Sequence, residues 1–137
     1  MWITPKTDWV VTDYFNADDY NRIVGNINYL KELAAKVIKD ITIDSMTADK
    51  GYTSIMYAAD MNAIENSLEI INENTYDFDF GESQSYTANG ATPLYNEFNR
   101  IESASLKLYQ TLIAQQNAKR HLAFRLGSER TFDVPRG

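Results

Sequence analysis

A five-residue pattern occurs three times in this chain and constrains most of what the chain can fold into. Each copy reads acidic residue, large apolar residue, Asn, any residue, Ile, and the copies occupy residues 19–23, 60–64 and 97–101. Their first residues lie 41 and 37 residues apart, which is within the usual range for repeats of one supersecondary unit. The sequence therefore predicts three copies of one structural unit.

An apolar register continues from each copy, with the alternating three- and four-residue steps of a helix that buries one face. Its positions are Tyr20, Ile23, Ile27, Leu30, Ala34, Val37 and Ile41 in the first copy, Met61, Ile64, Leu68 and Ile71 in the second, and Phe98, Ile101, Ser105, Leu108 and Leu112 in the third. We therefore expect helices over about residues 17–40, 58–74 and 93–121.

Residues suited to cap a helix precede two of these segments. Asn16 is a favourable N-cap, with Asp19 in the first turn, where a negative charge stabilises the helix. Thr92 and Pro93 form the second start signal, with Thr as the N-cap and Pro at the first helical position. Both signals agree with the register.

Three helices with one apolar stripe each can bury those stripes against one another. The expected fold is therefore mainly α, a three-helix bundle within a single domain over residues 1–137. We expect an N-terminal arm at 1–15, the bundle at 16–121 and an extended C-terminal tail at 122–137.

Alternation of apolar and polar residues predicts a short β-hairpin between the second and third helices. Residues 76–80 alternate, residues 81–83 favour a turn, and residues 85–87 are suited to a returning strand. The sequence leaves open whether strands near residues 76–88 pair with each other or with another chain.

Charge is distributed unevenly along the chain. The net charge of −6 divides into −10 over residues 1–99 and +4 over residues 100–137. The basic part is too small and mixed for a nucleic-acid footprint, and the acidic part would repel phosphates. The asymmetry suits a protein partner or further copies of the chain, although both ends being simply solvated is an equal alternative.

Membrane and catalytic signals are not found. No run of about 18 apolar residues is present, so we expect no membrane span. Residues 1–6 contain no basic region that leads into an apolar stretch, so we expect no signal peptide. The chain has no cysteine, and its single histidine, His121, has no identifiable nucleophile beside it. Asp77 and Asp79 would share one face of a strand, but a solvated face is favoured over a calcium site. We therefore expect no enzyme activity, no metal and no cofactor.

The repeated asparagines, Asn21, Asn62 and Asn99, each stand one residue past a core position. We expect them to hydrogen-bond the preceding loop or a neighbouring repeat rather than a ligand.

The same segments resemble a family. The opening Trp2-Ile3-Thr4-Pro5-Lys6-Thr7-Asp8-Trp9, followed by Tyr14-Phe15-Asn16 and by residues 19–23, resembles short proteins encoded in phages and prophages of Gram-positive bacteria. The element Glu97-Phe98-Asn99-Arg100-Ile101-Glu102-Ser103 resembles a helix start found in tail-fibre and baseplate-associated chains of such phages, and the ending Leu122-Ala123-Phe124-Arg125-Leu126-Gly127 is also similar. The second copy departs from the pattern, with Ala63 where the others have Arg.

This resemblance implies a structural role in the virion, at the tail tip, the baseplate or a fibre attachment, for a protein made in the host cytoplasm. We expect docking to other virion tail proteins and self-association, with a trimer as one candidate. The expected docking residues are Trp2, Trp9, Phe124, Arg125, Leu126, Arg130, Phe132 and Arg136. The two tryptophans could also stack on carbohydrate, and packing of the N-terminal arm onto the bundle is favoured over that interpretation. Two alternative functions are a receptor- or carbohydrate-binding module of the same particle and a small phage-encoded regulator that binds a host protein.

Overall fold

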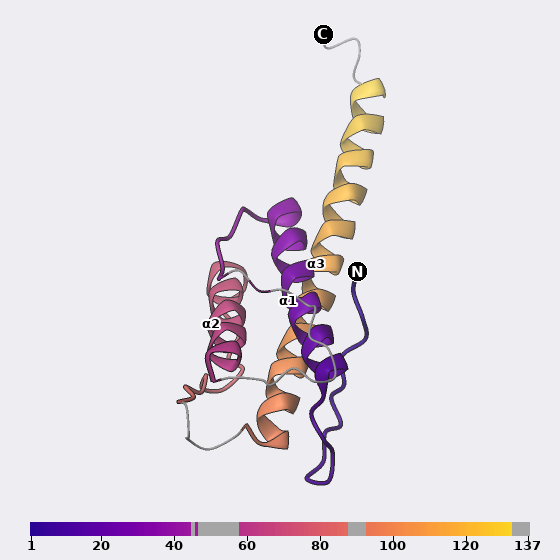
Figure 1. Ribbon diagram of the computed structural model, residues 1–137. Helices are drawn as coiled ribbons and strands as arrows, with labels where there is room; N and C mark the ends of the chain where they lie inside the picture. Colours follow the sequence, from indigo (N-terminus) through magenta and orange to yellow (C-terminus); the bar gives the residue numbers. More distant parts are fainter. Residues whose placement is uncertain (45, 47–57, 88–92, 133–137) are drawn as a thin grey trace.

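A computed structural model of the chain describes residues 1–44, 46, 58–87 and 93–132, with the backbone alone for 123–132. Within these residues the protein is mainly helical, and three helices pack against one another: α1 (Ala17–Val37), α2 (Ala58–Asn74) and α3 (Tyr95–Phe132) (Figure 1). Every position of the predicted apolar register is buried, from Tyr20 to Leu112. The predicted helical bundle and its core are thus confirmed.

The helices run in the same direction. On α1 and α3, Arg22 pairs with Glu102 near the helix starts, and Lys119 donates to the backbone oxygen of Val37 at the end of α1. A nearly constant sequence offset between paired residues means that two helices are parallel. Arg100 and Glu65 likewise pair near the starts of α3 and α2. Parallel helices require the chain to return along the bundle between them, and residues 75–87 make such a return beside α2 (Figure 1).

The start of α1 follows the capping prediction. The Asn16 side chain accepts from the Asp19 backbone N–H at 3.0 Å, and the Asp19 carboxylate accepts from the Asn16 backbone N–H at 3.0 Å. This reciprocal pair satisfies two of the N–H groups that a helix start leaves open. Thr92 lies outside the described residues, and α3 begins at Tyr95, two residues later than predicted.

The extended C-terminal tail predicted from residue 122 is wrong over its first part, because α3 continues to Phe132. Residues 122–132 contain no proline and include Leu, Ala, Arg and Glu, which favour a helix. Gly127 weakens a helix by only about 1 kcal/mol, so it does not end α3. Residues 133–137 lie outside the described residues.

The β-hairpin is not confirmed, since the described part of the chain, residues 75–87 included, contains no strand. Asp77, just after α2, adopts a positive φ of 53°, and Gly81 has φ of 87°. These two left-handed residues turn the chain back along α2. The backbone of residues 78–86 then bonds to side chains of α2 instead of to another strand.

Candidate functional site

The Asn of the third repeat copy binds one residue of the N-terminal arm through its whole amide group. The Trp9 backbone N–H donates to Asn99 Oδ1 at 2.7 Å, and Asn99 Nδ2 donates to the Trp9 backbone oxygen at 2.9 Å. The amide thus makes the same pair of bonds as a neighbouring β-strand would. The arm is therefore held on α3 without a sheet.

The second copy repeats this arrangement. Tyr86 donates its backbone N–H to Asn62 Oδ1 at 2.7 Å and accepts from Asn62 Nδ2 at 2.8 Å. Asn62 and Asn99 thus hydrogen-bond the protein itself, but their partners are extended segments that precede another helix and not the loop before their own helix. Asn21, at the first copy, also makes an interaction.

A glutamate three residues after each of these two asparagines binds the side chain of the same aromatic residue. Trp9 Nε1 donates to Glu102 Oε2 at 2.6 Å, and the Tyr86 hydroxyl donates to Glu65 Oε2 at 3.2 Å. Spacing of three residues places Asn and Glu on one side of a helix. The repeated unit is therefore Asn-x-Ile-Glu, a binding site for the backbone of one aromatic residue and for the N–H or O–H donor of its side chain.

The arginines of the repeats link these Asn-x-Ile-Glu sites, because each arginine binds the glutamate of another helix. Arg22 on α1 binds Glu102 on α3 at 2.7 and 2.8 Å, and it also binds Asp19 at 2.9 Å. In the same way, Arg100 on α3 binds Glu65 on α2, and it also binds Glu97 of its own helix at 2.8 Å. Each arginine thus neutralises one carboxylate of its own helix and one of the next.

The corresponding third ion pair, between α2 and α1, is absent because neither repeat position carries a charged residue. Ala63 stands where the other copies have arginine, and Val24 stands where they have glutamate. Val24 is fully buried, so an unpaired glutamate there would be a buried charge. Alanine in place of arginine at residue 63 of α2 is therefore matched by valine in place of glutamate at residue 24 of α1.

Two further asparagines bind the same extended segments at a second point. Ile3 exchanges two hydrogen bonds with Asn26, at 2.9 and 2.7 Å. Phe78 does the same with Asn72, at 2.9 and 2.7 Å. The arm and the 78–86 segment are each fixed at both ends.

Sequence reasoning missed Glu65, Glu102, Asn26 and Asn72. The glutamates had a signal, because extending the repeat by one residue gives Asn-x-Ile-Glu in two copies. Asn26 and Asn72 are not at equivalent repeat positions, so no sequence spacing identifies them.

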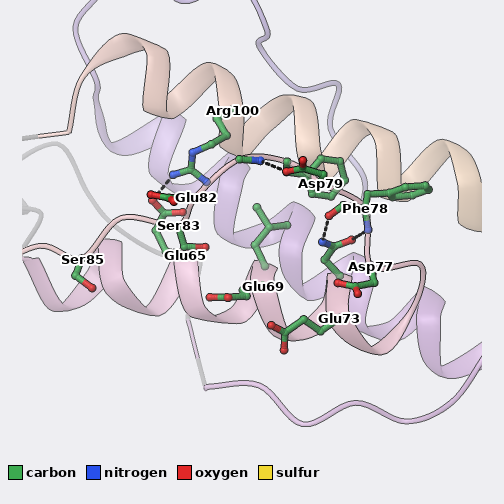
Figure 2. A pocket seen from close by; sticks show the side chains of 14 residues that line it. Glu65, Glu69, Glu73, Asp77, Phe78, Asp79, Glu82, Ser83, Ser85 and Arg100 are labelled. Atoms are coloured by element: carbon green, nitrogen blue, oxygen red, sulfur yellow. Dashed lines mark hydrogen bonds and ion pairs between the residues drawn. The ribbon is translucent and has the colours of Figure 1, made fainter.

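A groove of about 560 Å³ lies beside α2, bounded by the return segment and by Arg100 (Figure 2). Six carboxylates line it: Glu65, Glu69, Glu73, Asp77, Asp79 and Glu82. Glu65, Glu69 and Glu73 follow one another at four-residue steps along α2, so they form a row. The groove is therefore strongly acidic.

Glu65 is the most buried of these carboxylates, at 3% exposure. Its Oε2 accepts hydrogen bonds from Arg100, from the Tyr86 hydroxyl and from the Gln84 backbone N–H, whereas its Oε1 is buried without a partner. Burial, together with the Glu65 and Glu97 charges, raises the pKa of Tyr86. The Tyr86 hydroxyl therefore stays a donor to Glu65 well into the alkaline range.

The predicted docking residues fall into three groups. Trp9 is buried at 3% exposure, and Trp2 stacks on Tyr109 with ring centroids 4.1 Å apart, so both tryptophans pack within their own chain. Five residues belong to the last turns of α3, where only the backbone is described: Phe124, Arg125, Leu126, Arg130 and Phe132. Arg136 lies outside the described residues.

The described residues contain no group of three or more His, Cys, Asp or Glu residues arranged to hold a metal ion. No described helix combines the length and the apolar character needed to cross a bilayer. His121 is exposed on α3. The site holds polypeptide segments through amides and carboxylates.

Comparison with protein-family models, with curated proteins and with solved structures found no match to this chain.

Proposed function

We propose that this chain is a non-enzymatic structural protein of a phage virion, at the tail tip, the baseplate or a fibre attachment, and that it acts by docking to other proteins. The setting comes from the sequence resemblance of its start, its third repeat and its ending. The structural support comes from α3, which extends well past the other two helices (Figure 1).

This extension is the observation that carries the docking role. α3 has 38 residues, against 21 in α1 and 17 in α2. Among the α3 residues up to 122, whose side chains are described, the last buried one is Leu112, and Arg120, His121 and Leu122 are exposed. A helix that continues for several turns without a covering partner loses the packing that normally stabilises it. A partner that covers it supplies the missing burial.

The rest of the bundle suits a rigid support for this element. Ion pairs between Arg22 and Glu102 and between Arg100 and Glu65 are largely buried, and both extended segments are held at two points. Such interactions favour one arrangement of the helices. The end of α3 is thereby presented in a fixed direction.

Mass spectrometry of gradient-purified particles from the producing strain tests the setting. We expect a few copies per particle, in a multiple of three or six relative to a tail component of known number. Absence from intact particles would reject the virion role and favour the regulator of a host protein.

Deletion of residues 123–137 tests the docking role. We expect the far-UV circular dichroism per residue and the thermal transition of the bundle to be retained, because the buried register ends at Leu112. Incorporation into particles should be lost. A truncated chain that still assembles would contradict the assignment, and one that unfolds would show that the end of α3 belongs to the fold.

The carbohydrate-binding alternative loses Trp9, which is 3% exposed, whereas Trp2 is partly buried and has one face covered by Tyr109. Stacking on a sugar requires an aromatic face that is open to solvent.

A further inference from the structure

The acidic groove beside α2 contains more negative charge than its own chain neutralises. Among the described residues that line it, Arg100 is the one cation, and it already pairs with Glu65 and Glu97. Lys107 lies 5.3 Å from the ring of Phe78, a further lining residue, and forms no ion pair with the groove carboxylates within the described residues. Glu69, Glu73 and Glu82 are exposed and form no ion pair within the described residues. Carboxylates that lie together repel one another, and a bound cation relieves that repulsion.

A buried polar group in the groove wall also lacks a partner. Glu65 is 3% exposed, and its Oε1 accepts no hydrogen bond. A buried carboxylate oxygen without a donor costs free energy, so it favours a ligand that brings N–H groups. Guanidinium and ammonium groups carry both the donors and the positive charge.

The chain itself contains a segment of this chemistry. Residues 100–137 have a net charge of +4, against −10 for residues 1–99. Beyond the contact of Lys119 with Val37, the α3 extension carries Arg120, Arg125 and Arg130, with Glu129 as its single acid up to Phe132.

This segment is not able to reach the groove of its own chain. α3 runs parallel to α2 and continues beyond the end of α2, so its basic end points away from the groove (Figure 1). The row of glutamates on α2 lies level with the early part of α3, where Arg100 contacts Glu65 (Figure 2). Only another copy places a basic α3 end beside these carboxylates.

We propose that the groove formed by α2 and residues 77–85 binds the basic end of α3 from a second copy of this chain. The contact joins two different surfaces, so repetition of it produces a ring or a filament rather than a closed pair, unless two copies exchange ends reciprocally. Charge carries the recognition, so salt weakens it. The proposal deepens the docking function proposed above by naming one of its partners.

Sedimentation velocity on the full chain over a range of protein concentrations tests the proposal. We expect concentration-dependent association at about 50 mM salt that weakens at about 500 mM. The groove variant Glu69→Gln/Glu73→Gln should weaken association on the order of tenfold or more. The matched control is Glu32→Gln/Asp40→Asn, which removes the same charge from exposed positions away from the groove and should leave association unchanged.

A charge exchange makes the test independent of folding defects in any one variant. Arg125→Glu/Arg130→Glu alone and Glu69→Lys/Glu73→Lys alone should each lose self-association, whereas a mixture of the two should associate. Matching circular dichroism spectra establish that both are folded. A chain that is monomeric at every concentration and salt level would overturn the proposal, as would association that the groove variant leaves unchanged.

These results are separable from the virion role. A monomeric chain that is still found in particles would reject only the contact between copies. A self-associating chain absent from particles would reject only the virion setting.

Discussion

Arg22 on α1 and Glu102 on α3 form a bidentate ion pair, with nitrogen–oxygen distances of 2.7 and 2.8 Å, although they lie 80 residues apart in the sequence. The same Glu102 accepts from the Trp9 indole at 2.6 Å. One carboxylate therefore fixes two helices and the N-terminal arm together.

Replacing Arg22 by Met should destabilise the protein by about 3 kcal/mol, because it leaves the Glu102 charge buried with only neutral donors. Urea unfolding followed by far-UV circular dichroism measures the loss. Lys36→Met, on the exposed face of the same helix, is the control and should change the free energy of unfolding little. Equal effects of the two substitutions would show that the ion pair contributes nothing specific.

The missing third ion pair leads to a second prediction. Val24→Glu alone should destabilise the bundle by about 3–5 kcal/mol, because it buries an unpaired charge at a fully buried position. Adding Ala63→Arg places the arginine where the repeat pattern puts it, and we expect it to recover part of that loss. Ala63→Arg on its own supplies the fourth corner of the double-mutant cycle. A double variant no more stable than Val24→Glu would reject the equivalence of the three repeats.

The contacts of Asn99 predict that its substitution weakens the attachment of the N-terminal arm to α3. Asn99→Ala removes both hydrogen bonds to the Trp9 backbone and should cost about 1–2 kcal/mol. We also expect a red shift of tryptophan fluorescence and faster proteolysis within residues 1–15, because Trp9 would become more exposed. Asn66→Ala removes an exposed amide whose single hydrogen bond is 3.3 Å long, so it should have neither effect. An unchanged arm in Asn99→Ala would show that aromatic packing alone holds Trp9.

The sequence was sufficient to predict the core but not the direction of the helices. Periodicity identifies each buried face, and every register position from Tyr20 to Leu112 is buried. The segments between the helices are long enough for either a parallel or an antiparallel arrangement, so length did not decide between them. What decides is the pairing of Arg22 with Glu102 and of Arg100 with Glu65, which only the folded chain shows.

The candidate site was predictable where the repeat carried it. Asn62 and Asn99 stand at repeated positions, which singled them out as hydrogen-bonding residues, but the segments that they bind, at Tyr86 and Trp9, were not predicted. Glu65 and Glu102 are charged residues in the core, where charges are rare unless paired, so an apolar register does not identify them. The groove depends on the return of residues 77–85 along α2, and alternation in that segment indicated a strand instead.

Tyr86 gives a prediction about alkaline stability. Burial and the nearby Glu65 and Glu97 charges raise its pKa above the ordinary value near 10, which the unfolded chain retains. The folded state therefore holds the phenol proton more tightly than the unfolded state. The contribution of this group is fully present below about pH 10 and is lost as pH rises from there towards the folded pKa.

We therefore expect the unfolding free energy of the native chain to fall between about pH 9 and about pH 11 more steeply than that of Tyr86→Phe, which has no phenol to ionise. Urea unfolding across this range measures both slopes. Tyr14→Phe is the control, since Tyr14 is 90% exposed, and its slope should match that of the native chain. In a spectrophotometric titration of the folded proteins, the native chain should show one tyrosine that ionises at a higher pH than the others, and Tyr86→Phe should lack it. Identical slopes for Tyr86→Phe and the native chain would show that Glu65 and burial do not hold the Tyr86 proton.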